Sequence, residues 1–353
     1  MEKENLTAGI ATLTRMSTNN FNEKLEKVKS PRLKKIIVST VAGDGTAGFH
    51  DGPALTAKFK SPLDVAVSAD GTIYVADGFN SCIRKIKYGQ VTTFAGNGSA
   101  NISNGNSTAA RFKIPTRLTL DVAGNIYTLD AADPRLRKIT PAADVSTYAG
   151  TNTFGFQNGD ADISQFGQSF GIVADIHGNI YVADSQNNNI RRINIAGQVT
   201  TIAGTGVQGF MNGGIETALF YFVKGIVIDK RGNLFVSDYN RVRKISTDGI
   251  VSTFAGSGMT GYTDGKVRTA RFSQIEAMVM NELGDIYLTE GNRIRKISAR
   301  GIVSTVAGST AGYQDGDAAS AKFNQPKGLG IDKQGNIYVA DDQNNRIRKI
   351  SFE

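Results

Sequence analysis

The sequence contains few of the residues from which metal and nucleophilic sites are usually built. Among its 353 residues there are one cysteine, Cys82, and two histidines, His50 and His177. A single cysteine excludes an internal disulfide framework. The two histidines lie in unrelated turn sequences, without a partner at metal-ligand spacing, so a zinc-dependent enzyme is not indicated.

Long apolar runs are absent as well. No stretch of about 18 apolar residues occurs, so we expect no membrane-spanning helix. Residues 1–18 lack the basic start and the apolar centre of a secretory signal. The sequence therefore leaves two locations open. The protein is cytoplasmic, or it is a mature form of an exported protein of the periplasm or cell surface.

Proline is scarce and glycine is abundant, with 7 and 40 residues respectively. This balance is typical of all-β proteins with many tight turns. A chain of this length would ordinarily suggest two domains of about 150 residues each. Internal repeats favour one continuous architecture instead, because stacked copies share their cores.

The clearest repeat unit is a hairpin-like segment whose sequence is Gly-Asn-Ile-Tyr-Val-Ala-Asp-Asp-Gln-Asn-Asn-Arg-Ile-Arg-Lys-Ile, residues 335–350. Near-copies occupy 178–193 and 232–245, and looser copies begin at Gly71, Gly124 and Gly284. Each holds two strand-like runs joined by a short polar loop, as a β-hairpin does. A second phrase resembling Val-Ser-Thr-Val-Ala-Gly also recurs, and its final glycines are 53, 54, 54, 52 and 52 residues apart. Such even spacing indicates a repeat architecture.

Four strand-like segments recur in six repeats, which predicts an all-β, six-bladed β-propeller of four-stranded antiparallel blades. The chain finishes on a third strand, so the last blade lacks its outer strand. Residues 36–43 carry the missing phrase and are expected to close the ring as an N-terminal strand. The propeller domain is therefore 36–353. Residues 1–35 are expected to be a leader, either disordered or with a short helix that presents Phe21, Leu25 and Val28 on one face.

These motifs resemble the NHL-repeat family of six-bladed propellers, especially bacterial members with the Gly-Asn-x-Tyr-Val-Ala-Asp…Asn-x-Ile-Arg-Lys-Ile signature. The resemblance covers residue 36 to the C-terminus. It implies the fold but not an activity, because this fold serves both as an enzyme and as a binding platform.

Each repeat ends its second strand with a carboxylate: Asp77, Asp130, Asp184, Asp238, Glu290 and Asp341. Six equivalent carboxylates could surround a central cation. A structural ring is favoured, because such a residue can accept hydrogen bonds from loop amides and pair with the arginine of the next strand. A basic pair such as Arg84-Lys85 also recurs in all six third strands, and these pairs account for 12 of the 40 lysines and arginines. The net charge of +8 is therefore better explained by the repeat than by an acidic partner.

One position varies from repeat to repeat, at the start of the innermost strand. There the predicted rim of the central channel carries Asp64, Arg117, Phe170, Lys224, Glu276 and Lys327. A mixture of charges and an aromatic ring suits an asymmetric ligand. The loops after Asp238 and Glu290 are also shorter than in other repeats. They are predicted to open one face beside Tyr221 and Phe222, unless these two rings pack between blades.

Three functions remain open. The leading prediction is a monomeric, non-catalytic scaffold without a cofactor that binds a glycan or a protein partner through this rim. Bacterial proteins of the resembled family are often exported, which favours a glycan. A calcium-dependent hydrolase or lactonase is the alternative, and it would need Asp64 and Glu276 to converge on one ion. RNA binding through Arg117, Lys224 and Lys327 is the least favoured, because few aromatic residues alternate with these charges.

Overall fold

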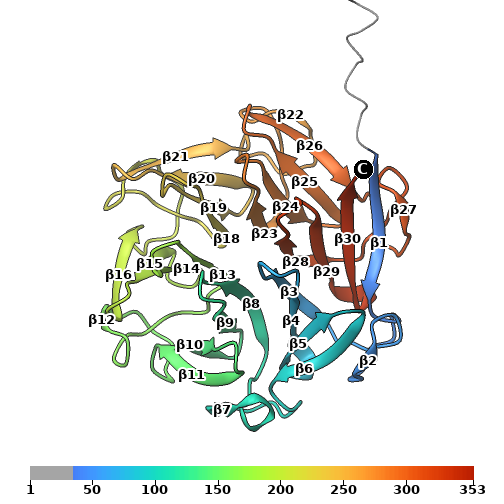
Figure 1. Cartoon of the computed structure of the whole chain (residues 1–353). Coiled ribbons are helices and arrows are strands. Elements are labelled where there is room, and N and C mark those ends of the chain that lie inside the picture. Colours follow the sequence, from blue (N-terminus) through green and yellow to red (C-terminus); the bar gives the residue numbers. More distant parts are fainter. Residues whose placement is uncertain (1–34) are drawn as a thin grey trace, which may run out of the picture. The chain divides into compact units, whose positions relative to one another are not determined.

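The computed structural model describes residues 35–353, and its compact unit runs from Ile36 to Phe352. Figure 1 shows this unit as six sheets arranged around a central channel. The helix predicted near residues 20–31 lies outside the described residues. The prediction of an all-β, six-bladed propeller is confirmed.

Within each sheet, strands that follow one another in the chain lie side by side, from the channel to the outer edge. The innermost strands are β3 (Pro62–Val67), β8 (Pro115–Leu120), β13 (Gly171–Ala174), β18 (Val223–Ile228), β23 (Ile275–Met280) and β28 (Pro326–Ile331). The second strands are β4 (Ile73–Asp77), β9 (Ile126–Asp130), β14 (Ile180–Asp184), β19 (Leu234–Asp238), β24 (Ile286–Glu290) and β29 (Ile337–Asp341). The third strands are β5 (Cys82–Lys87), β10 (Asp133–Ile139), β15 (Asn189–Ile193), β20 (Arg241–Ile245), β25 (Arg293–Ile297) and β30 (Arg346–Phe352). The fourth strands are β6 (Gln90–Ala95), β11 (Asp144–Ala149), β16 (Gln198–Ala203), β21 (Ile250–Ala255), β26 (Ile302–Ala307) and β1 (Ile36–Ala42).

Each blade has one strand more than predicted. Short fifth strands lie outside the fourth strands: β2 (Gly52–Pro53), β7 (Gly105–Asn106), β12 (Gly159–Asp160), β17 (Gly213–Gly214), β22 (Gly265–Lys266) and β27 (Gly316–Asp317). They follow the glycine-rich turns of the repeat. At Gly52 the backbone φ of +132° is one that favours glycine, and the chain there turns back along Val91 of β6. A two-residue strand carries almost no sequence signal of its own.

The N-terminal strand closes the ring, as predicted. β1 pairs antiparallel with β30, where Val38 faces Ile350, and its other edge pairs with β27. The last blade thus combines the two ends of the described chain. This arrangement covers edges that would otherwise remain unpaired.

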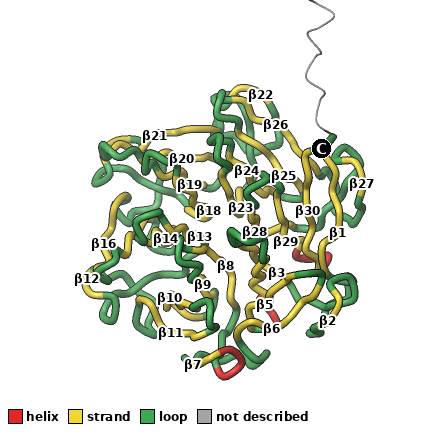
Figure 2. The backbone as a smooth tube through the Cα atoms, in the orientation of Figure 1, coloured by secondary structure: helices red, strands yellow, loops and turns green. Residues whose placement is uncertain are grey.

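The core lies between blades rather than within one layer. Ala66 and Ile83 of the first blade pack with Leu118 and Ile126 of the second, and corresponding clusters recur around the ring. Both faces of each sheet are therefore buried. Within residues 35–353, helix is confined to three short 3-10 turns, η1 (Gly78–Asn80), η2 (Ser107–Ala109) and η3 (Asp342–Asn344), as Figure 2 shows. In the part of the chain that is described, no helix is long and apolar enough to cross a membrane.

Candidate functional site at the channel mouth

The carboxylates that end the second strands are buried structural groups. Arg84 Nη1 donates to Asp77 Oδ2 at 2.7 Å, and the backbone N–H of Lys60 donates to Asp77 Oδ1 at 2.8 Å. The guanidinium lies between the rings of Phe49 and Phe59, at 5.0 and 5.1 Å from their centroids. A buried charge requires this degree of pairing. Equivalent ion pairs join Asp184–Arg191, Asp238–Arg243, Glu290–Arg295 and Asp341–Arg348.

The second blade is an exception to this ring. Asp130 accepts hydrogen bonds from backbone amides instead, those of Lys113, Ile114 and Ala132. Arg137 donates to the side chain of Asn104 at 2.8 Å and forms no ion pair with Asp130. Arg137 faces Thr128, two residues before Asp130, which is the same register as that of the paired arginines, so a shift between the strands does not account for the missing pair. The predicted carboxylate–arginine pairing is thus confirmed in five blades and wrong in one.

Four of the predicted rim residues meet at the channel mouth, from the third, fourth and fifth blades. Lys224 Nζ donates to Glu276 Oε2 at 2.7 Å. The same ammonium lies 5.5 Å from the ring centroid of Phe170 and 5.2 Å from that of Phe222. Burial lowers the pKa of Lys224 although Glu276 opposes this effect. Burial acts against ionisation of Glu276, but nearby lysine charges outweigh it and lower the pKa of this carboxyl.

A polar hollow of about 310 Å³ lies beside this cluster, between the fifth and sixth blades. Its walls are Ser273, Gln274, Glu276, Gly291, Asn292, Gln325, Pro326 and Lys327. The backbone N–H of Gln325 donates to Asn292 Oδ1 at 2.9 Å, which joins the two blades across the hollow. Gly291 and Asn292 form one of the predicted short loops, between β24 and β25. The hollow is therefore on the top face, where these loops and the entries to the inner strands lie.

The other short loop contributes Tyr239 to an exposed aromatic pair, whose second member, Tyr221, precedes β18. The rings of Tyr221 and Tyr239 meet edge to face at 5.6 Å and are 48% and 37% exposed. The backbone amides of Tyr221 and Phe222 donate to Asp238 Oδ1 at 2.8 and 3.0 Å. A ring carboxylate thus positions the aromatic segment. Tyr221 is exposed at the surface, and Phe222 is partly buried against Lys224.

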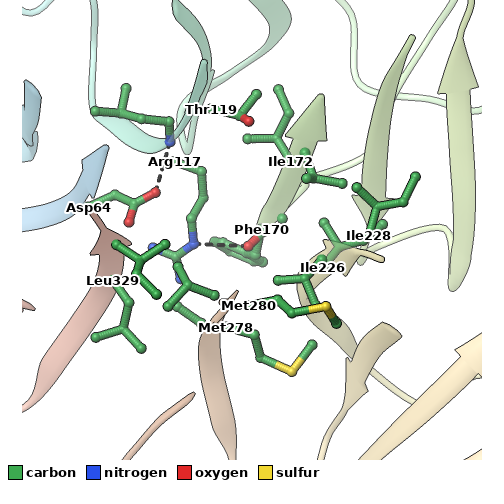
Figure 3. Close-up of a pocket in the computed structure, with 18 residues that line it drawn as sticks. Asp64, Arg117, Thr119, Phe170, Ile172, Ile226, Ile228, Met278, Met280 and Leu329 are labelled. Carbon is green, nitrogen blue, oxygen red and sulfur yellow. Dashed lines mark hydrogen bonds between the residues drawn. The ribbon is translucent and has the colours of Figure 1, made fainter. Parts of the chain in front are cut away.

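Asp64 and Arg117 lie below the mouth, inside the channel, and are only 5% and 7% exposed. Arg117 donates to backbone carbonyls of four blades, those of Leu63, Thr116, Phe170 and Glu276. The Asp64 carboxylate accepts from the amides of Val65 and Leu118 at 2.9 and 2.8 Å. Burial raises the pKa of Asp64 to about 6, although the charge of Arg117 opposes this rise. Figure 3 shows Arg117 lying across the channel toward Phe170.

One segment has the spacing of a nucleophile elbow. It is Gly-Gln-Ser-Phe-Gly at residues 167–171, which matches Gly-x-Ser-x-Gly. Such an elbow exposes its serine on a turn between a strand and a helix. Here Ser169 is 6% exposed, its hydroxyl donates to the carbonyl of Gly167, and strand β13 follows. Ser169 therefore lies at the buried start of a strand and not on an exposed turn between a strand and a helix. Nor do the described residues gather three His, Cys, Asp or Glu side chains into a metal-binding group.

Sequence reasoning missed four residues of this face: Tyr239, Gln274, Asn292 and Gln325. Tyr239 and Asn292 occupy the short loops, so loop length was a usable signal for them. Gln274 and Gln325 lie just before β23 and β28, and only the packing of adjacent blades brings them together.

Comparison with known sequences identifies the repeat. The family model of the NHL repeat matches residues 59–86 and 323–350. Mouse Teneurin-3 is 26% identical over 369 aligned positions, which cover 89% of this chain and 13% of Teneurin-3. Human Teneurin-4 is 27% identical over 354 positions, covering 86% of this chain and 12% of Teneurin-4. The chain thus spans only a small part of the curated relatives that it matches.

Solved structures share the fold at low identity. A Bacteroides thetaiotaomicron protein of unknown function has a TM-score of 0.70 at 22% identity, covering 91% of this chain and 76% of its own. An auxiliary nutrient binding protein from the same organism has a TM-score of 0.68 at 17% identity, covering 91% and 77%. A gluconolactonase from Xanthomonas campestris has a TM-score of 0.58 at 8% identity, covering 90% and 89%. Together with the repeat signature and the six sheets, these findings show that the chain contains NHL repeats and has a six-bladed β-propeller fold.

Proposed function

We propose that this protein is a non-catalytic binding module whose top face recognises a glycan. The observation that carries the proposal is the polar hollow between the fifth and sixth blades. Its carboxamides, Glu276 and Lys327 offer both donors and acceptors at close range. Sugar hydroxyls need both kinds of partner, and a concave site with a few convergent polar groups is the usual form of a ligand pocket.

The neighbouring aromatic residues extend the site. Glu276 lines the hollow and is hydrogen-bonded to Lys224, which lies against the ring of Phe222. Tyr221, whose ring is exposed, directly precedes Phe222 in the chain. Aromatic rings with a polar tip suit a ligand that has an apolar face and a hydroxylated edge. A pyranose ring is such a ligand.

The same geometry argues against hydrolysis of the glycan. Glycosidases usually place two carboxyl groups on either side of the bond that they cleave. Glu276 is paired with Lys224, and Asp64 is buried beneath Arg117. A calcium-dependent hydrolase would require several oxygen ligands around one ion. At this mouth the carboxylate of Glu276 is instead accompanied by the charges of three cations, Arg117, Lys224 and Lys327.

Nucleic-acid binding also has little support at this mouth. Of the cations predicted for it, Arg117 and Lys224 are less than a tenth exposed. A phosphate backbone is bound by cations that can reach it and release counterions. The similarity in fold to an auxiliary nutrient binding protein supports a binding role, whereas the fold alone does not separate binders from enzymes.

The test is a glycan array followed by calorimetric titration of the best ligand. We expect Asn292→Ala and Lys327→Ala each to weaken binding roughly ten-fold, the effect of losing about one hydrogen bond. Lys333→Ala is the matched control, because Lys333 is an exposed lysine of the same blade in the loop that joins β28 to β29. It should leave affinity unchanged.

Three results would overturn the proposal. They are no glycan binding, equal losses in Lys333→Ala and Lys327→Ala, or turnover of the bound glycan. Capture of a protein partner that the Asn292→Ala variant fails to bind would assign the same face to protein recognition instead.

A further inference from the structure

A second cavity lies inside the channel, on the other side of Arg117 from the polar hollow. It has a volume of about 200 Å³, and residues of all six blades line it. Its walls are mostly aliphatic, and Figure 3 shows Ile172, Ile226, Met278 and Leu329 among them, each less than a tenth exposed. The residues nearest the ends of the inner strands are only half-buried, namely Thr119, Val173, Ile228, Met280 and Ile331. The cavity therefore opens toward the face opposite the polar hollow.

The upper end of this cavity is closed by backbone and by Arg117. At two inner-strand positions there is no room for a side chain. A Cβ on Gly171 would collide with the carbonyl of Lys224, and one on Gly328 would collide with the carboxylate of Asp64. The strands approach closely there, and the guanidinium fills the remaining space. The channel is thus a pocket closed at one end, not an open pore.

Arg117 lines this pocket and has one N–H that donates no hydrogen bond to the protein. A guanidinium has five N–H groups. Nε donates to Phe170, Nη1 donates to Leu63 and Thr116, and Nη2 donates once, to Glu276. The fifth N–H has no acceptor among these bonds. A buried donor without a partner is costly, so an acceptor oxygen at this point would be favoured.

The charge at the closed end is already balanced. Asp64 and Arg117 are both buried and interact electrostatically. A ligand with its own carboxylate would add an unpaired negative charge beside Asp64, in a region from which water is largely excluded. An uncharged acceptor avoids this cost.

We propose that the cavity binds a small, uncharged, mainly aliphatic molecule that carries one carbonyl oxygen. The oxygen accepts from the free N–H of Arg117, and the hydrocarbon part fills the aliphatic walls. The size is suitable, because an apolar cavity of about 150 Å³ in a protein core is known to take up benzene. The site is independent of glycan binding on the opposite face.

Cyclohexanone is the probe, with cyclohexane and hexanoate as comparisons, and binding is followed by ligand-observed NMR titration. We expect cyclohexanone to bind roughly ten-fold or more tightly than cyclohexane, since only the ketone satisfies the guanidinium donor. Hexanoate should bind more weakly than cyclohexanone. Met280→Phe, at the half-buried opening, should raise the dissociation constant for cyclohexanone at least ten-fold by filling the space.

Met259→Phe is the matched control, because Met259 is 56% exposed on a loop outside the channel. It should leave cyclohexanone binding unchanged. If Met280→Phe does not give a native circular dichroism spectrum, Ile228→Phe at the same opening replaces it. The proposal is overturned if the wild type does not bind cyclohexanone, if cyclohexane binds equally well, if hexanoate binds more tightly, or if the filled variant binds like the wild type.

Discussion

The ring of carboxylate–arginine pairs and the channel mouth differ in how deeply their charged side chains are buried and in how often they recur. In the ring, each arginine is completely buried, and nearly every blade repeats the same partners. At the mouth, Lys224 and Glu276 retain some exposure, and no other blade has the same combination. The comparison indicates that residues which recur in every blade have a structural role, because all six blades need the same stabilising contacts. A position that departs from the repeat is free to serve a ligand.

The second blade shows the limit of that rule. Asp130 and Arg137 also depart from the repeat, yet each simply finds other buried partners. A deviation therefore suggests a site only where exposed polar groups accompany it, as they do around Asn292 and Lys327.

The largest effect should come from breaking a ring pair. Arg348→Met leaves the carboxylate of Asp341 buried without its cation, so we expect a loss of about 3–5 kcal/mol in the free energy of unfolding. Arg137→Met provides the comparison, because Asp130 keeps its three amide donors. Its loss should be smaller, about 1–3 kcal/mol. Denaturant titrations of the two variants measure the difference, and equal losses would contradict the distinction between the blades.

A smaller effect should appear as a dependence on pH inside the channel. The pKa of Asp64 is raised to about 6 by burial, against about 4 in an unfolded chain. The folded protein therefore takes up this proton first. The resulting stabilisation is complete below about pH 4 and is lost as the pH rises through 6.

Asp64→Asn removes this titration. Between pH 4 and pH 7 the stability of the wild type should fall relative to the variant by about 1–3 kcal/mol. Unfolding of both proteins by denaturant across this range measures the change. A relative stability that does not vary with pH would show that Asp64 remains ionised throughout.

The ion pair at the mouth should contribute less to stability than a ring pair does. The side chains of Lys224 and Glu276 are 11% and 17% exposed, against 0% for both members of the Arg348–Asp341 pair, so we expect their coupling in a double-mutant cycle of Lys224→Met and Glu276→Gln to be about 0.5–2 kcal/mol. A coupling as large as the loss in Arg348→Met would mean that the mouth pair is another structural support.

The smallest effect on stability should come from the exposed aromatic residue. Tyr221→Ala removes a ring that is 48% exposed and leaves the backbone bond to Asp238 in place. The free energy of unfolding should change by less than about 1 kcal/mol, whereas affinity for the glycan should fall. A large drop in melting temperature would identify Tyr221 as part of the core.

Much of the fold could be predicted because its signals are local. The hairpins, the even spacing of the glycines and the missing outer strand of the last blade all lie within short segments, and β1 completes that blade as expected. The ring pairs follow from the hairpin register in five blades, whereas Arg137 has the same register and donates to Asn104 instead. The site could be predicted less well. Arg117 bonds carbonyls that lie 54 and 159 residues away, so its place depends on how all the inner strands approach one another. Gly171 and Gly328, which allow this approach, each follow the rim residue of their repeat, but the sequence does not show which neighbouring backbone or side chain they approach.

The central claim is that the top face beside the short loops binds the ligand. Hydrogen exchange with and without the glycan found on the array tests it most directly. We expect protection to increase at residues 221–226, 273–276, 290–293 and 325–328, and to remain unchanged in the opposite-face turns at 175–179 and 332–336. Protection confined to those turns, or to the outer edges of the blades, would contradict the account.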